Sequence, residues 1–235
     1  MTDPAPGPTG WQLADVVAAW PESSTARTLR LRLSEPWPYL PGQHVDVRLT
    51  APDGYQAQRS YSIASAPTDD GMIELTVQRL ADGEVSPYLC DIVEVSDQIE
   101  LRGPIGGYFV WRGDGPVLLV GGGSGLVPLM SILRHRARTA PDVEVRTIVS
   151  VRTPGDLLYA GELEGDTRLI YTRAGPPGWA DPPRRLRPDD IASAAFDAGV
   201  AYVCGPTGFV DRVADLLLSA GYAPERILTE RFGPT

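Results

Sequence analysis

The sequence predicts two domains, an antiparallel β-barrel over residues 1–113 and an α/β domain with a mostly parallel sheet over residues 114–235. Apolar and polar residues alternate in the first half, which is the period of strands that bury one face. In the second half, short apolar runs alternate with segments of helical period, as in a parallel sheet covered by helices. The pattern changes near residues 113–116, Gly-Asp-Gly-Pro.

The first half contains several short strands separated by Pro and Gly. Strict alternation predicts strands over residues 29–33, 45–49 and 73–77. A short helix is expected over residues 86–92. Short strands at this spacing are typical of an antiparallel barrel.

The second half alternates strands with helices. Strands are expected over residues 117–120, 143–151, 168–172 and 201–204. Apolar residues at helical spacing predict amphipathic helices over residues 126–133 and 209–217. Residues 174–188, rich in Pro and Arg, are expected to form a loop.

Composition excludes several classes of function. The chain of 235 residues has a net charge of −9, and all its 21 basic residues are Arg, so we expect no nucleic-acid partner. Two cysteines and two histidines argue against a disulfide scaffold, an iron–sulfur cluster and a metal site. Residues 1–113 carry 8 Arg and 15 acids, net −7, whereas residues 114–235 carry 13 Arg and 15 acids, net −2. Arg residues of the second half can therefore serve a phosphate locally, or be solvated surface charges.

The sequence also predicts a soluble, cytoplasmic protein without a membrane partner. No apolar run approaches the roughly 18 residues of a membrane helix. Residues 1–9 lack the basic-then-apolar pattern of a signal peptide.

The first candidate binding motif is Arg59-Ser60-Tyr61-Ser62 at the start of a strand. An Arg can bind a pyrophosphate through its planar fork, Tyr offers a flat face for a ring system, and a Ser hydroxyl both donates and accepts. The alternative is a strand with a polar end and no ligand.

Two glycine-containing turns could bind anions. Gly83 precedes a helix start containing Val85 and Ser86, where free backbone N–H groups suit an anion. The alternative is a helix cap on Ser86.

The run Gly121-Gly122-Gly123-Ser124-Gly125 follows a strand and opens a helix, which is the context of a phosphate-binding turn. Leu126 stands where a sixth-position glycine would complete the dinucleotide pattern, so a plain tight turn is the alternative.

Together, the motifs resemble the ferredoxin–NADP reductase superfamily from about Trp11 to Gly233. The matching segments, in order, are Arg59-Ser-Tyr-Ser, Gly83-x-x-Ser86 with Tyr88-Leu89, Gly103-Pro-x-Gly106 with Phe109, Gly121-Gly-Gly-Ser-Gly with Pro128, Cys204-Gly205-Pro206, and Glu230-x-Phe232.

The resemblance implies FAD and a nicotinamide dinucleotide as cofactors. It places Arg59, Gly83, Val85 and Ser86 at the FAD pyrophosphate, Tyr61 at the isoalloxazine and ribityl region, and Ser62 near flavin N5, with Ser60 and Val77 as further FAD contacts. It places the dinucleotide on Gly121, Gly122, Gly123, Ser124 and Gly125, with Cys204, Gly205 and Pro206 at the nicotinamide. Ser62, Cys204, Glu230 and Phe232 would be the residues closest to the chemistry.

Several of these residues have simpler explanations. Cys204 ends an apolar strand, so it can be a small buried hydrophobe. Phe232 can be a packing plug at the C terminus. The ends of two expected strands carry Arg152 and the pair Thr172-Arg173. These residues would bind the 2′-phosphate of NADPH, which predicts a preference for NADPH over NADH. The alternative for Arg152 is an ion pair with Asp156 or Glu162.

The activity that the resemblance implies is hydride transfer from NAD(P)H to FAD, followed by delivery of single electrons. Because the sequence has no cysteines for a fused cluster, we expect a stand-alone reductase whose acceptor is a separate ferredoxin or oxygenase component. The alternatives are a reductase of free flavins or small oxidants, and a non-catalytic electron-transfer or regulatory subunit that keeps only the fold.

Overall fold

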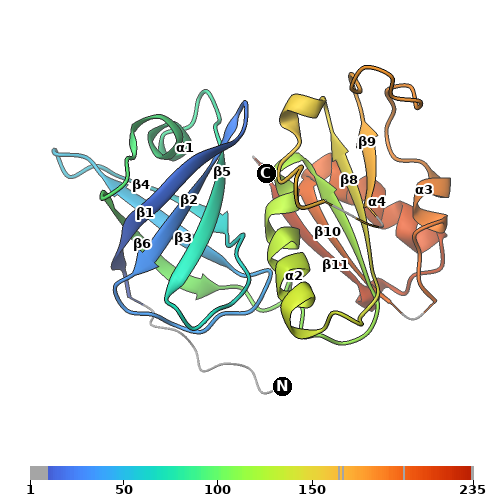
Figure 1. The fold of residues 1–235 in the computed structure, drawn as a ribbon, viewed down its shortest axis with the longest axis horizontal. Coiled ribbons are helices and arrows are strands. Elements are labelled where there is room, and N and C mark those ends of the chain that lie inside the picture. The colour runs from blue at the N-terminus through green and yellow to red at the C-terminus, as the bar shows by residue number, and fades with distance from the viewer. Residues whose placement is uncertain (1–9, 164, 166, 198, 234–235) are drawn as a thin grey trace. The chain divides into compact units, whose positions relative to one another are not determined.

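Six antiparallel strands form the sheet of the first unit in a computed structural model that describes residues 10–163, 165, 167–197 and 199–233 (Figure 1). Residues 1–9, where the sequence lacks a leader pattern, lie outside the described part. The strands are β1 (Gln12–Ser23), β2 (Ala26–Leu33), β3 (His44–Thr50), β4 (Gln56–Ser62), β5 (Met72–Gln78) and β6 (Gln98–Ile105), in the order β4-β3-β6-β1-β2-β5.

The first sheet closes into the predicted barrel. All its neighbouring strands pair antiparallel, and a bridge between Ile63, just after β4, and Leu75 of β5 joins the two ends of the strand order. On β2, Leu29 and Leu31 are fully buried while Arg30 between them is exposed, as the alternation predicts. Burying one such leucine contributes about 1.5–3 kcal/mol.

The expected helix over residues 86–92 is present as two successive pieces. They are α1 (Val85–Pro87) and a π-helical turn, η1 (Tyr88–Ile92). Arg27 of β2 satisfies carbonyls at the end of η1, donating to Val93 O at 2.7 Å and to Cys90 O at 3.1 Å. A guanidinium at this end also complements the helix dipole.

The second unit is a five-stranded parallel sheet with helices. Its elements are β7 (Val117–Gly122), η2 (Gly123–Gly125), α2 (Leu126–Thr139), β8 (Val145–Val151), η3 (Pro154–Asp156), β9 (Thr167–Tyr171), α3 (Pro188–Ala192), β10 (Val200–Pro206), α4 (Thr207–Ser219), η4 (Pro224–Arg226) and β11 (Ile227–Phe232). The strand order is β11-β10-β7-β8-β9, and all neighbours are parallel. The predicted fold class is therefore confirmed.

The structure adds detail to the predicted second half. β11 is a fifth strand that the sequence pattern did not predict, because three polar or charged residues, Thr229 to Arg231, follow Ile227 and Leu228 and none of them is buried. The strand expected from residue 143 begins at Val145. The Pro- and Arg-rich segment is irregular up to Pro188, where α3 begins.

Two compact units account for the described chain. Among the described residues, the barrel unit extends to Arg112 and includes Met130–His135, the middle of α2, and the α/β unit is Gly113–Leu129 with the chain from Arg136 onward. Within the described residues, no helix combines the length and apolar character needed to cross a membrane.

Candidate cofactor-binding sites

The order of strands in the α/β unit reverses at β7. The chain runs from β7 outward through β8 to β9, and then returns to the other side of β7 for β10 and β11. Open parallel sheets bind ligands in the crevice outside the carboxyl ends of their strands at such a reversal. Gly121 of β7 lies opposite Cys204 of β10, so the predicted glycine turn and the Cys204-Gly205-Pro206 segment meet at this point.

The glycine turn is closely packed. A Cβ added to Gly125 would collide with the carbonyl oxygen of Cys204, and one added to Gly122 would approach the ring of Phe209 at 2.8 Å. Gly125 therefore allows α2 to start against β10, and Gly122 leaves room for Phe209 of α4, which supports the tight-turn interpretation for both. Gly123, in contrast, has φ +56° and open space around the Cβ position. A contact of Gly123 and Ser124 with phosphate stays a prediction.

Cys204 and Glu230 lie opposite one another at the same edge, Cys204 buried and Glu230 partly buried. Cys204 is fully buried, and it lies opposite Glu230 on β11. Burial, helped by the charge of Glu230, raises the pKa of the Cys204 thiol well above its usual value, so the thiol stays protonated. Burial also raises the pKa of Glu230 to about 7. Phe232 lies opposite Pro206 and is half-buried.

The predicted 2′-phosphate residues meet at the carboxyl ends of β8 and β9. The backbone N–H of Thr172 donates to Val151 O at 2.8 Å, and that of Arg173 donates to Arg152 O at 2.9 Å. The Arg152 guanidinium pairs with Asp156 at 2.6 Å, as the simpler explanation predicted. Although burial opposes it, hydrogen bonds from Thr153 and Arg152 hold the Asp156 pKa below its usual value. The exposed Arg173 side chain has no hydrogen bond or ion pair within the described residues.

In the barrel unit, the two predicted halves of the pyrophosphate site lie together. Arg59 of β4 is 3.8 Å from the carboxylate of Glu84, the residue that precedes α1. The Tyr55 hydroxyl donates to the same carboxylate at 2.8 Å. Glu84 was not among the predicted residues, although its place between Gly83 and Ser86 was a signal that it would face the same site.

Ser86 does not cap the helix, so that alternative is wrong. The helix begins at Val85 with Glu84 as the preceding residue, and no side chain caps it. Instead, the Ser86 hydroxyl accepts a hydrogen bond from the backbone N–H of Leu80 at 3.1 Å. A Cβ on Gly83 would lie 2.9 Å from the Ser86 oxygen, so a side chain here would force the Ser86 hydroxyl to move.

Ser62 carries a sign of a missing ligand in the barrel unit. Its hydroxyl is buried and has no hydrogen-bond partner within the described residues. Buried polar atoms normally have partners, so an orphaned one points to a ligand that supplies it. Together with Arg59 and the Gly83–Ser86 turn, this hydroxyl fits FAD.

The remaining predicted FAD residues take different positions. Tyr61 packs against the barrel core, and burial raises the pKa of its hydroxyl. The Ser60 hydroxyl donates to Asp46 at 2.7 Å, and Val77 is fully buried. Their contact with FAD stays a prediction.

Family models match both domains of the chain. A model of the oxidoreductase FAD-binding domain matches residues 14–110, and one of the oxidoreductase NAD-binding domain matches residues 119–215. The cofactors are therefore FAD and a nicotinamide dinucleotide.

Relatives of known function include reductase components of oxygenase systems. The chain is 30% identical to the reductase component of propane 2-monooxygenase from Rhodococcus jostii over 87% of its length, and it covers 59% of that protein. It is 30% identical to the ferredoxin–NAD(P)+ reductase component of the naphthalene 1,2-dioxygenase system from Pseudomonas putida, covering 93% of this chain and 68% of that protein. The chain thus spans less than two thirds of the propane 2-monooxygenase component.

A solved structure shares the whole architecture. The FAD/NAD-binding domain of nitric oxide dioxygenase from Vibrio cholerae superposes with a TM-score of 0.85 at 25% identity, covering 95% of this chain and 99% of that domain. Since both domain models match in order and the fold is shared from end to end, the chain belongs to the ferredoxin–NADP reductase superfamily.

Proposed function

We propose that this protein is an NAD(P)H-dependent reductase that delivers electrons through FAD to a separate protein acceptor. The observation that carries this proposal is the pair of cofactor sites in one chain. The barrel unit holds Arg59 beside the Gly83–Ser86 turn with the unpartnered Ser62 hydroxyl, and the strand order of the α/β unit reverses at β7, where open parallel sheets bind ligands.

When bound, FAD supplies the redox chemistry, since it accepts a hydride from the reduced nicotinamide and releases electrons singly. The residues of this chain would bind and orient the two cofactors. Arg59 offers a planar fork of donors for the pyrophosphate. We expect Ser62 to donate a hydrogen bond at the flavin, because its buried hydroxyl has no partner within the described residues. The Cys204 thiol keeps its proton, so it contributes to the nicotinamide site by packing and not by proton transfer. The Glu230 carboxyl is partly protonated near neutral pH.

The acceptor that we propose is a ferredoxin or an oxygenase component. Several relatives are reductase components of a monooxygenase or dioxygenase system, which supports this class of acceptor. We place the reaction in the cytoplasm, where reduced nicotinamide is supplied.

Steady-state reduction of acceptors by the purified protein tests this function. We expect yellow protein that releases FAD on heating and that reduces ferricyanide, and cytochrome c through an added ferredoxin, at the expense of NADPH or NADH. Free FMN and riboflavin should have a lower kcat/KM. A better kcat/KM for free flavin would make the protein a flavin reductase, and a colourless protein that cannot be reconstituted with FAD would make it a non-catalytic subunit.

A further inference from the structure

The segment directly after Ser62 is held by hydrogen bonds from several directions. It leaves β4, and Ile63 bridges to Leu75 of β5. The backbone N–H of Ala64 donates to Glu74 O at 2.8 Å, and the Ser65 hydroxyl accepts from the Glu74 N–H at 3.0 Å. The buried Tyr39 hydroxyl lies 2.8 Å from the Ser65 hydroxyl.

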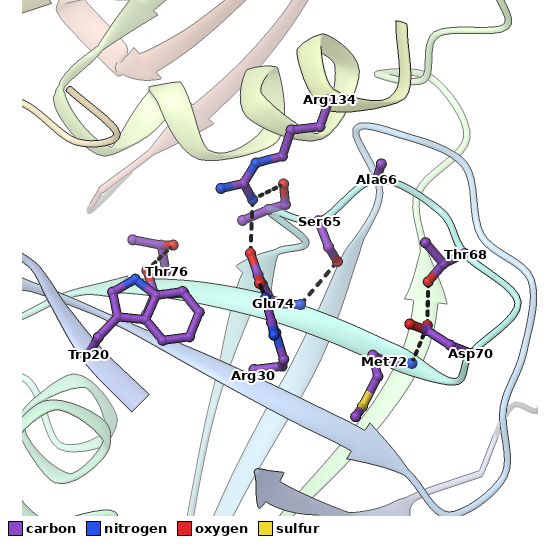
Figure 2. Close-up of polar contacts among 12 residues, drawn as sticks. Trp20, Arg30, Ser65, Ala66, Thr68, Asp70, Met72, Glu74, Thr76 and Arg134 are labelled. Atoms are coloured by element: carbon purple, nitrogen blue, oxygen red, sulfur yellow. Dashed lines mark hydrogen bonds and ion pairs between the residues drawn. The ribbon is translucent and has the colours of Figure 1, made fainter. Parts of the chain in front are cut away.

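Two side chains of α2, both within the barrel unit, contact the carbonyl groups of this segment. Figure 2 shows one of them, Arg134. Arg134 Nη1 donates to Ala64 O at 2.9 Å, and the Ser131 hydroxyl donates to Ser65 O at 2.6 Å. The same Nη1 pairs with Glu74 Oε2 at 2.9 Å. Arg134 therefore bridges the segment after Ser62 to the buried carboxylate of β5.

Glu74 has a second cationic partner that does not contact the segment. Arg30 of β2 donates to Glu74 Oε1 from Nε at 3.0 Å and from Nη2 at 2.6 Å (Figure 2). The Glu74 side chain is 11% exposed, so its charge needs partners, and Arg30 already supplies two hydrogen bonds. Compensation of the Glu74 charge therefore does not by itself account for Arg134 and Ser131. Their additional effect is to fix the carbonyl groups of Ala64 and Ser65 by hydrogen bonds.

We propose that Arg134 and Ser131 are positioning residues for the Ser62 hydroxyl. Ala64 and Ser65 follow Ser62 by two and three residues, so fixing their carbonyls limits how far the Ser62 backbone can shift. Catalysis that depends on orientation is sensitive to such shifts, since a misplacement of about 1 Å can cost up to about 10²-fold in rate. The inference rests on the proposed function, because Ser62 has a reacting group to address only if FAD is reduced here.

Stopped-flow reduction of the FAD-loaded protein by NADPH separates positioning from plain stability. We compare Arg134→Met and Ser131→Ala, which remove the contacts to the segment, with Arg30→Met, which removes a partner of Glu74 and the cation–π contact with Trp20 but no contact to the segment. Limiting flavin reduction should slow by about fivefold or more in Arg134→Met, with an unchanged apparent Kd for NADPH, because orientation and not binding is disturbed. Ser131→Ala should show a smaller decrease in the same step. Arg134→Lys should recover part of the rate, since an ammonium has three donors.

The control variant decides the interpretation. Arg30→Met is expected to lower the melting temperature as Arg134→Met does, and to keep the limiting rate within about twofold of wild type. Equal losses of rate in the two variants, or unchanged rates in both Arg134→Met and Ser131→Ala, would overturn the positioning role. If Arg134→Met does not fold, Ser131→Ala alone against Arg30→Met decides it. A wild-type protein that NADPH and NADH do not reduce at all would instead contradict the proposed function.

Discussion

Cys204 and Glu230 lie directly opposite one another on the parallel strands β10 and β11. Burial raises the pKa of the carboxyl from its usual value of 4.5 to about 7, and it raises the pKa of the thiol as well. Both groups therefore favour their neutral forms at this edge of the sheet.

This pairing predicts a pH-dependent cost to stability. Because the folded-state pKa of Glu230 is raised, the folded protein binds more protons than the unfolded chain between pH 4.5 and about 7. Stability is then lost as the pH rises through that window. The stability of Glu230→Gln should fall less over this window than that of wild type. Its melting temperature should therefore gain on wild type by about 5 °C or more between pH 5 and pH 8, because a pKa raised from 4.5 to about 7 corresponds to on the order of 3 kcal/mol.

Differential scanning calorimetry across pH checks this expectation. Glu225→Gln, which removes an exposed acid of η4, is the matched control and should show no such divergence. A constant difference between Glu230→Gln and wild type at every pH would contradict the shifted pKa.

Arg59 should be required for tight binding of FAD. Removing a hydrogen bond to a charged group costs about 1.5–3 kcal/mol, so Arg59→Ala should weaken FAD binding by that amount. Titration of the apoprotein with FAD, followed by quenching of flavin fluorescence, measures it. Arg79→Ala is the control, because Arg79 is likewise part-exposed and pairs with an acid, Asp91, at 2.7 Å. Equal weakening by both variants would mean a general charge effect.

Glu84 should oppose FAD binding rather than assist it. Its carboxylate lies 3.8 Å from the Arg59 guanidinium and would compete with the pyrophosphate for that cation. Both side chains are about half exposed, so the effect is small, in the range of about 0.2–1 kcal/mol for exposed pairs. Glu84→Gln should therefore tighten FAD binding by up to about fivefold in the same titration. A weaker complex would show that the carboxylate holds Arg59 in place for the ligand.

Phe232 should control access of the nicotinamide to the flavin, as the family resemblance implies. Phe232→Ala is expected to increase the charge-transfer absorbance formed on mixing with NADPH and to change the rate of flavin reduction. The reason is that no aromatic ring would then occupy the nicotinamide position that the resemblance assigns to Phe232. Phe232→Tyr, which keeps the ring, should behave like wild type. Unchanged spectra and rates in Phe232→Ala would return this residue to a packing role.

Local patterns predicted most of the fold but not the contacts that give the sites their properties. Alternation at Leu29, Arg30 and Leu31 is a local property, so β2 could be read from the sequence. β11 lacked such a pattern, since it gains its pairing from β10. The unpartnered state of Ser62 and the Arg134–Glu74 pair depend on residues distant in the chain, and no spacing rule predicts them.

The choice between NADPH and NADH depends on Arg173. Its side chain is exposed, has no partner within the described residues, and follows β9 at the sheet edge where dinucleotides bind. Arg152 is beside it through the backbone but is already paired with Asp156, so we expect it to contribute less. Arg173→Ala should raise the KM for NADPH by about tenfold or more, equivalent to roughly 1.4 kcal/mol, and leave that for NADH nearly unchanged. Steady-state kinetics with both cofactors measure this difference, with Arg185→Ala as an exposed control of equal charge. A wild-type kcat/KM that favours NADH, or an equal loss with both cofactors in Arg173→Ala, would contradict the assignment, because a 2′-phosphate contact can affect only NADPH.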